Sequence, residues 1–306
     1  YYIGTATLRK AIEQSMNIPT VKVLNEISIG LGYEYVQKFG ISTLDSTDQY
    51  NESLALGGIK TGVYNYELTA AYAAIANGGT YYKPILYTKV LDHDGNVLID
   101  NTQEPVTVLK DSTAALLTSA MEDVVSKGTA APYAQLNNMA VAGKSGTTSY
   151  NKDFWFSGYT PYYTCSIWLG YDDNKEMSGS NWYYHEKIWA KIMNRIDSEL
   201  NLPYKDFSMP STIERKTICT ETGLLAIPDE CPSLTEYFAP GTAPTETCGG
   251  HYVEPEPEEE PDDTDDNNHS GSNNSNDNNN NSGTTTPTTP TEPTTPSEPS
   301  TDPDTE

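Results

Sequence analysis

The stretch that decides the fold is residues 139–171, which read MAVAGKSGTTSYNKDFWFSGYTPYYTCSIWLGY. It contains three strand-like runs, at residues 139–142, 153–158 and 162–171, separated by short polar or Gly/Pro links. In the last run every second residue is apolar, which is typical of a strand with one buried face. Consecutive strands joined by short links favour antiparallel pairing. The stretch therefore predicts an antiparallel sheet.

Segments with helical spacing lie on both sides of this predicted sheet. A last helix, over residues 182–200, places Ile188, Ile192 and Ile196 on one stripe. Before the sheet, we expect a helix capped by Thr7 and further helices over residues 19–30, 33–39, 65–77 and 112–127. Helices followed by consecutive strands and a closing helix predict an α+β domain.

One hairpin is expected within the helical part. Residues 87–91 and 96–99 are apolar runs, and His93-Asp94-Gly95 lies between them. Asp-Gly between two apolar runs is a hairpin signal because both residues tolerate the backbone angles of a tight turn.

Charge and apolar content divide the chain unevenly. The 306 residues include 18 Lys+Arg and 43 Asp+Glu, a net charge of −25. Residues 254–306 hold 15 acidic residues and nine prolines but no Lys, Arg or apolar side chain. Such a segment cannot bury a core. We therefore expect a main domain over residues 1–205, a small cysteine-containing module over 206–253 and a disordered acidic Asn/Thr/Pro-rich tail over 254–306.

Several classes of protein are disfavoured. The acidic balance and the lack of a Lys/Arg cluster with interleaved aromatic residues argue against nucleic acid as a partner. No run of about 18 apolar residues suggests a membrane span. The chain opens at Tyr1 with no initiator Met and no signal peptide, so we expect a fragment whose targeting information lies upstream.

Cysteines occur at positions 165, 219, 231 and 248, and none forms a C-x-x-C pair. With no His expected at ligand spacing beside them, zinc is disfavoured, and we predict no metal and no cofactor. Cys219, Cys231 and Cys248 fall in a loop-rich segment, which favours a disulfide in an oxidising compartment, with Cys219–Cys231 the weakly preferred pair. Three free thiols are the alternative. Cys165, on an apolar strand face, is expected to be a buried free thiol.

Two short motifs carry candidate chemistry. In the motif that begins at Gly143 and continues Lys144-Ser145-Gly146-Thr147-Thr148, Lys144 supplies a charge, Ser145 and Thr147 supply hydroxyls, and Gly146 leaves room for close approach. Such an edge suits a carboxylate, although the tripeptide K-S-G alone is equally typical of a polar turn. Ser15-Met16-Asn17, at a break between helices, is by itself typical of a helix end. Together, S-x-N followed by K-[ST]-G is the order found in active-site serine penicillin-recognising enzymes.

The resemblance extends beyond these motifs. Residues 7–19 (TLRKAIEQSMNIP), 54–58 (LALGG), 142–148 (AGKSGTT) and 153–161 (DFWFSGYTP) resemble class A, bifunctional penicillin-binding proteins. The resemblance covers residues 1 to about 200. Residues 219–251 are similar to C-terminal extensions of such proteins from Gram-positive bacteria. The resemblance over residues 1 to about 200 implies the α+β penicillin-binding/beta-lactamase-like transpeptidase fold in an N-terminally truncated form.

The resemblance also implies an activity and a set of site residues. A peptidoglycan D,D-transpeptidase uses a serine to attack the D-Ala-D-Ala end of a stem peptide and passes the acyl group to an amine; beta-lactams mimic that substrate. By this resemblance Ser15 relays a proton and Asn17 holds the substrate backbone. Lys144 binds the substrate carboxylate, and the expected substrate-binding residues are Ser145, Gly146, Thr147 and Thr148, with the Thr147 backbone N–H completing an oxyanion hole.

One motif departs from the family pattern. The nucleophile motif S-x-x-K should precede S-x-N, but the chain has it only at Ser149–Lys152, in the expected hairpin. We therefore expect the nucleophile, a glycosyltransferase domain and a membrane anchor upstream of Tyr1. The chain as given is then an inactive fragment. We expect its parent protein at the extracellular face of the cytoplasmic membrane. The alternatives are a non-catalytic wall-surface or regulatory module and a serine beta-lactamase. The LALGG segment and residues 76–79 (ANGG) argue against the beta-lactamase.

Overall fold

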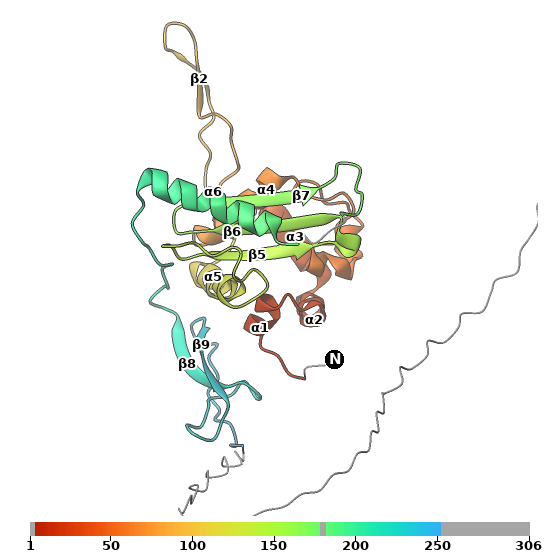
Figure 1. Cartoon of the computed structure of the whole chain (residues 1–306), viewed down its shortest axis with the longest axis vertical. Helices are drawn as coiled ribbons and strands as arrows, with labels where there is room; N and C mark the ends of the chain where they lie inside the picture. The colour runs from red at the N-terminus through yellow and green to blue at the C-terminus, as the bar shows by residue number, and fades with distance from the viewer. Residues whose placement is uncertain (1–3, 178–181, 252–306) are drawn as a thin grey trace, which may run out of the picture. The chain divides into compact units, whose positions relative to one another are not determined.

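The computed structural model describes residues 4–177 and 182–251 of the chain (Figure 1). The expected disordered tail over 254–306 lies outside these residues. No helix in the described ranges has both the length and the apolar character needed to cross a membrane.

A three-stranded antiparallel sheet in the order β5-β6-β7 organises the domain, as predicted. Its strands are β5 (Ala142–Thr147), β6 (Asp153–Tyr159) and β7 (Thr164–Gly170). The prediction for the first strand is wrong, because β5 begins where that prediction ended and includes the whole K-S-G motif. Pairing with β6 holds these glycine-containing residues extended despite their low intrinsic preference for strands.

Every predicted helix is present, with shifted ends. The second begins at Asn17, two residues before Pro19, and ends at Ile27, where Ser28 has a φ of 76°. The helices are α1 (Leu8–Glu13), α2 (Asn17–Ile27), α3 (Ile29–Lys38), α4 (Asn65–Ala76), α5 (Asp111–Ser126) and α6 (Tyr184–Leu200), with 3-10 turns at Asp48–Tyr50, Glu52–Leu56 and Ser149–Asn151. Helices packed on an antiparallel sheet confirm the α+β class.

Helix α6 covers one face of the sheet (Figure 1). Trp189 of α6 packs edge-on against Phe156 of β6, with ring centroids 5.1 Å apart, and both side chains are fully buried. On β6, Tyr159 bonds instead to Thr118 of α5, with 2.8 Å between the hydroxyl oxygens. The alternation along β6 thus fixes the sheet between α6 and α5.

The predicted apolar stripe of α6 is only partly correct, since Ile196 packs against the buried core but Ile188 and Ile192 do not. Ile188 and Ile192 are 41% and 39% exposed, whereas Trp189 and Met193 are buried. The first half of the helix packs through the neighbouring position Trp189 rather than through Ile188, because the large Trp189 ring fills the space beside Phe156.

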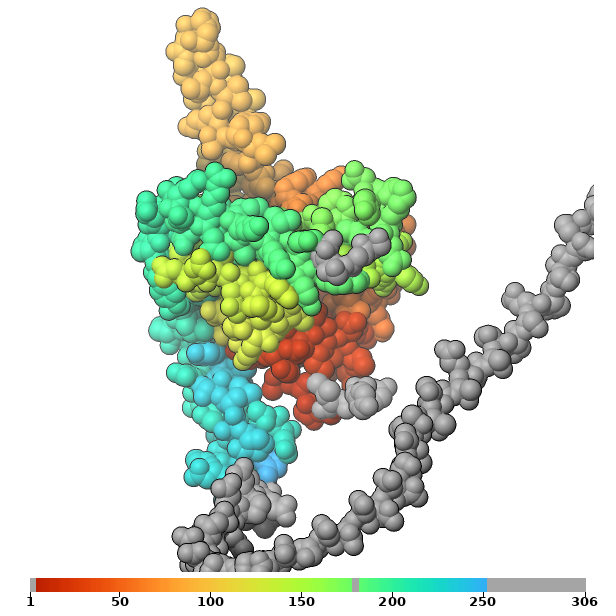
Figure 2. Space-filling view, in the orientation of Figure 1, coloured from red at the N-terminus to blue at the C-terminus, as the bar shows by residue number. Residues whose placement is uncertain are grey.

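The predicted hairpin is confirmed as β2 (Lys89–Leu91) paired with β3 (Val97–Asp100). Every residue of both strands is exposed. Figure 2 shows the hairpin, in orange, projecting from the chain with nothing packed on it in that view. Strands β1 (Thr80–Tyr81) and β4 (Val106–Thr107) pair at its base. The hairpin therefore adds nothing to the core.

The module after α6 is built on β8 (Glu214–Cys219) and β9 (Ser233–Phe238), which pair antiparallel. All four cysteines carry free thiols in the structure, so the expected Cys219–Cys231 bridge is not formed. Cys165 is half-buried rather than buried. The expectation that no His stands at ligand spacing is also wrong. His251 follows Cys248 by three positions, and its Nε2 lies 3.2 Å from the Cys248 sulfur.

Candidate active site

Ser15 holds the end of α1 in an unusual backbone conformation. Its φ is 53°, in the left-handed region that favours glycine. The amides of Ser15 and Met16 donate to the carbonyls of Ile12 and Ala11, at 3.2 and 2.8 Å. This pair of bonds is the Schellman motif, which stops the helix and turns the chain. The Ser15 hydroxyl is placed by this turn.

Lys144 meets that hydroxyl from the sheet. In β5 it pairs with Ser157 of β6, and its Nζ donates to the Oγ of Ser15 at 2.8 Å. A second Nζ–H donates to the carbonyl of Ser145, also at 2.8 Å. The structure thus brings the S-x-N and K-S-G motifs together, and one N–H of the ammonium remains for a further acceptor.

Burial shifts the ionisation of this lysine. It lowers the pKa of Lys144 to about 8, and the opposing charge of Glu186 on α6 holds it from falling further. Burial also raises the pKa of Glu186 to about 7, against the pull of Lys144. A lysine with a pKa close to neutral can give up and regain a proton during a reaction.

Ser145 and the end of α1 are tied to the same turn after α5. The Ser145 hydroxyl lies 2.9 Å from the hydroxyl of Thr129. The Thr129 amide donates to the carbonyl of Glu13 at 3.2 Å, two residues before Ser15. Gly128 makes this possible, because a Cβ there would collide with the Glu13 carbonyl and with the Cα of Val124. Sequence reasoning missed Thr129 and Glu13, whose roles depend on this long-range packing.

The last residues of the motif, Gly146 to Thr148, differ in whether they face open space or are already hydrogen-bonded. A Cβ on Gly146 would meet only the Trp155 Cβ, at 3.6 Å, and Thr147 is exposed. The Thr148 hydroxyl, by contrast, accepts from the Asp153 amide and donates to its carboxylate, both at 2.9 Å. Gly146 and Thr147 therefore face open space, whereas the hydroxyl of Thr148 closes the β5–β6 turn.

The remaining predicted residues lie near the same site or in the turn. Asn17 is the exposed first residue of α2, two positions after Ser15. Ser149–Asn151 form a short helical turn between β5 and β6, as expected for the late S-x-x-K motif, with Ser149 and Tyr150 exposed.

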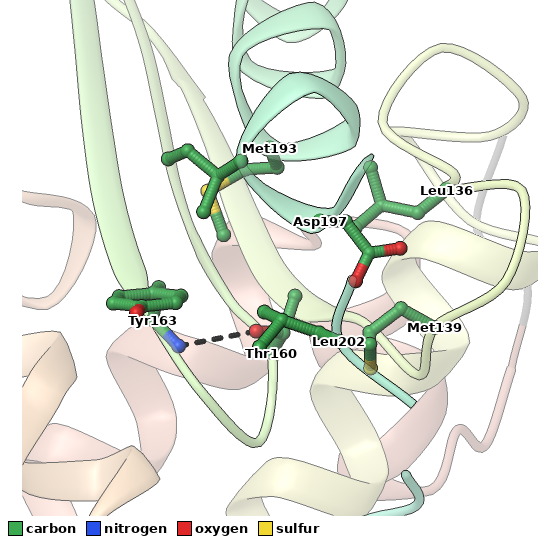
Figure 3. Close-up of a pocket in the computed structure, with 8 residues that line it drawn as sticks. Leu136, Met139, Thr160, Tyr163, Met193, Asp197 and Leu202 are labelled. Carbon is green, nitrogen blue, oxygen red and sulfur yellow. Dashed lines mark hydrogen bonds between the residues drawn. The ribbon is translucent and has the colours of Figure 1, made fainter. Parts of the chain in front are cut away.

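Figure 3 shows a separate pocket beside α6, lined by Leu136, Met139, Met193 and other side chains. Its dashed line is the bond from the Tyr163 amide to the Thr160 hydroxyl, 3.1 Å long. The cavity volume is about 10 Å³, which is room for a single water at most. None of the predicted site residues lines it, so it is not the candidate site.

A family comparison agrees with the motif geometry. The penicillin binding protein transpeptidase domain matches residues 1–195, and the penicillin-binding protein 1A C-terminal domain matches residues 209–252. The chain belongs to the penicillin-binding protein transpeptidase family. The C-terminal match falls on the module that contains β8 and β9.

Relatives of this penicillin-binding protein domain are longer proteins. It is 35% identical to penicillin-binding protein 1A of Clostridium perfringens over 263 residues, which are 82% of this chain and 31% of that protein. It is 32% identical to penicillin-binding protein 1A of Clostridium botulinum, over 80% of this chain and 30% of that protein. The chain therefore spans about a third of the length of these relatives.

The fold also matches a crystal structure of penicillin-binding protein 1A from Haemophilus influenzae. The TM-score is 0.66 at 25% sequence identity, covering 79% of this chain and 41% of that chain. The penicillin-binding transpeptidase fold expected from the sequence is thereby confirmed.

Two buried groups of this penicillin-binding protein domain were missed by sequence reasoning. His185 and Glu186 begin α6 and are each 2% exposed. Among the described residues, neither ring nitrogen of His185 has a hydrogen-bond partner. The Oε2 atom of Glu186 has none there either. Burial lowers the pKa of His185 to about 4, so its ring is neutral. Glu186, as the carboxyl group that opposes Lys144, belongs to the candidate site.

Proposed function

We propose that the chain forms part of the active site of a serine-type peptidoglycan D,D-transpeptidase, acting on D-Ala-D-Ala stem peptides and acylated by beta-lactams. The contact between Lys144 and Ser15 carries this proposal, since it joins two family motifs that are 129 positions apart. Membership of the transpeptidase family supports it further.

In this reaction the nucleophilic serine gives its proton to the lysine of its S-x-x-K motif, and its oxygen attacks the carbonyl carbon of the penultimate D-Ala. The C–N bond to the terminal D-Ala then breaks, and the leaving nitrogen takes a proton. Ser15 already accepts a hydrogen bond from Lys144, so its own hydroxyl proton is free to pass to that nitrogen. Lys144, with its pKa near 8, then replaces the proton. Its positive charge and the hydroxyls of Ser145 and Thr147 attract the substrate carboxylate.

Strand β5 supports binding of an extended peptide. It pairs only with β6 among the described strands, so it is an edge of the sheet. Alternate backbone N–H and C=O groups of an edge strand are unpaired and can bind another extended chain. The Thr147 amide is proposed to serve the oxyanion hole, and Asn17 to hold the substrate backbone. We leave Thr148 out of the binding set because its hydroxyl is committed to Asp153.

The proposal assigns residues 1–205 to the transpeptidase part and residues 206–253 to an accessory module. The nucleophilic S-x-x-K is supplied by a segment outside this sequence, in a parent that also carries the glycosyltransferase activity and is anchored at the outer face of the cytoplasmic membrane. The two family matches, to residues 1–195 and 209–252, support the boundary between the first two parts.

Fluorescent penicillin tests the proposal. The 306-residue chain should form no covalent adduct, whereas a longer protein that adds an S-x-x-K segment before Tyr1 should be acylated. In that longer protein, Lys144→Ala should lower the acylation rate by about 100-fold, because it removes both the charge and the proton donor.

Lys152→Ala is the matched control, since Lys152 belongs to the S-x-x-K of the turn and should not affect acylation. Equal rates for Lys144→Ala and the unchanged protein would refute the site. An adduct on Ser149 would show that the nucleophile is Ser149, in the turn between β5 and β6. Rapid hydrolysis of the adduct would instead indicate a beta-lactamase, and no acylation of the longer protein would indicate a non-catalytic module.

A further inference from the structure

The C-terminal module gathers four side chains that can ligate a metal ion. The sulfurs of Cys219, Cys231 and Cys248 and a ring nitrogen of His251 all lie within 4.8 Å of one another. The His251 Nε2 lies 3.1 Å from the Cys219 sulfur and 3.2 Å from the Cys248 sulfur. Ligands about 2.0–2.3 Å from a tetrahedral zinc ion stand roughly 3.5–3.8 Å apart. The cluster needs only small movements to close around such an ion.

Three separate stretches of the module converge on this cluster. Cys219 ends β8, Cys231 lies two residues before β9, and Cys248 and His251 follow a bridge between Leu225 and Thr247. The Cys248 amide donates to the Leu225 carbonyl at 2.8 Å, and Leu225 is in turn bridged to Ile218 of β8. The site is therefore built by the fold of the whole module rather than by one local loop.

The histidine is oriented as a zinc ligand would be. Its Nδ1 faces the Glu221 carboxylate at 3.1 Å, while its Nε2 faces the sulfurs. A neutral ring that donates Nδ1–H to a carboxylate leaves the Nε2 lone pair for a metal. Glu221 thus selects the ring tautomer that binds zinc.

The module has a very small apolar core. Within the described residues 206–251, the buried apolar side chains are Ile218, Cys219 and Cys248. A two-stranded sheet with so small a core is marginal in water, and small modules of this kind depend on disulfides or a metal. One disulfide would use two of the three cysteines and leave the third and the histidine without a role.

From this arrangement we propose that Cys219, Cys231, Cys248 and His251 bind one structural Zn²⁺ ion. Thiolate and imidazole ligands in a Cys₃His set suit zinc, and four protein ligands close the coordination sphere, so the ion is structural rather than catalytic. The metal links the end of β8, the segment before β9 and the segment at Cys248, and the module folds around it.

The test uses the complete 306-residue chain. Purified under reducing conditions and equilibrated with zinc, it should retain about one zinc per chain by elemental analysis. The same chain loaded with Co²⁺ should show the visible bands of tetrahedral cobalt and the near-ultraviolet charge-transfer band of cobalt–thiolate bonds. His251→Ala should weaken zinc binding by more than about 10-fold, and Glu221→Gln by about 10-fold.

Two variants separate ligation from folding. Cys165→Ser is the matched control, since Cys165 lies on β7 in the sheet, and it should keep the full zinc content. His251→Cys should also retain cobalt, with a stronger thiolate band. Loss of zinc in Cys165→Ser as well as in His251→Ala would contradict ligation by this cluster. A chain that binds no zinc, or whose secreted form shows a disulfide among Cys219, Cys231 and Cys248 by non-reducing peptide mapping, would overturn the proposal.

Discussion

The Nζ of Lys144 lies 2.8 Å from the Oγ of Ser15, although the two residues belong to a strand and to a helix end 129 positions apart. The contact depends on the left-handed backbone of Ser15 and on the extended backbone of β5. Neither element alone places a hydroxyl beside an ammonium group. The contact between these two candidate site residues is therefore a product of the tertiary fold.

Substitutions at Ser15 should separate backbone strain from hydrogen bonding. Ser15→Gly relieves the positive φ and loses the hydroxyl, so the free energy of unfolding should stay within about 0.5 kcal/mol of the unchanged protein. Ser15→Ala keeps the strain and loses the bond, and should cost about 1 kcal/mol. Urea unfolding at pH 7 measures both. Equal losses in the two variants would show that the φ of 53° costs nothing.

Two glycines of β5 should respond differently to alanine. A Cβ on Gly143 would lie 2.7 Å from the Phe156 ring, so Gly143→Ala should destabilise the fold by about 1–3 kcal/mol. Gly146→Ala meets only Trp155 at an ordinary distance and should change stability by less than about 0.5 kcal/mol. In a protein that is acylated, Gly146→Ala should nevertheless slow acylation. Thermal unfolding compares the pair, and a large loss in Gly146→Ala would mean that its open side is filled.

Arg9 ties α1 to the C-terminal module. Its guanidinium makes two bonds to the Glu236 carboxylate, 2.7 and 2.6 Å long, and a third to Asp123 at 3.1 Å. These bonds hold the pKa of Arg9 above its usual value despite burial. Glu236→Gln should cost about 2 kcal/mol of stability, because bidentate charge-assisted bonds are lost.

A double-mutant cycle with Arg9→Lys isolates this pair. Lysine keeps the charge but cannot bind both carboxylate oxygens in a fork, so the two single losses should not add. Lys22→Gln, at an exposed position of α2, is the control and should change stability by less than about 0.5 kcal/mol. Fully additive losses would mean that Arg9 and Glu236 act independently.

Glu122 should make stability depend on pH. Burial, with the nearby charges of Asp206 and Asp123, raises its pKa from 4.5 to about 7 in the folded protein. The folded state therefore binds more protons than the unfolded state between these values, and stability falls as pH rises from about 4.5 to about 7. Glu122→Gln removes the buried charge and should raise the melting temperature at pH 8 by about 2–4 °C, with little change at pH 4.5. The same gain at both pH values would exclude ionisation as the cause.

Local signals in the sequence predicted the helices and strands better than they predicted the contacts between them. The hairpin at residues 89–100 was predictable because Asp94-Gly95 encodes a tight turn by itself. The start of β5 was not, because the glycines of the K-S-G motif favour a turn and only pairing with β6 extends them. The stripe of α6 was misplaced because periodicity cannot rank Trp189 above Ile188 without knowing what lies opposite.

The two sites differ in the same way. The S-x-N and K-S-G motifs identified the residues of the candidate active site, but not Thr129 in the turn after α5 or Glu186 on α6. The cysteines were noticed, but His251 was overlooked because a single C-x-x-H pair carries little weight until Cys219 and Cys231 are brought beside it.

The exposed β2–β3 hairpin offers a practical route for protein engineering. Its strands bury no side chain against the domain, so an insertion at its tip should leave the packing of the domain unchanged. A fluorescent protein spliced between Asp94 and Gly95 would be carried away from β5 and from the cysteine cluster. The domain could then be followed in living cells with both of its ends untouched.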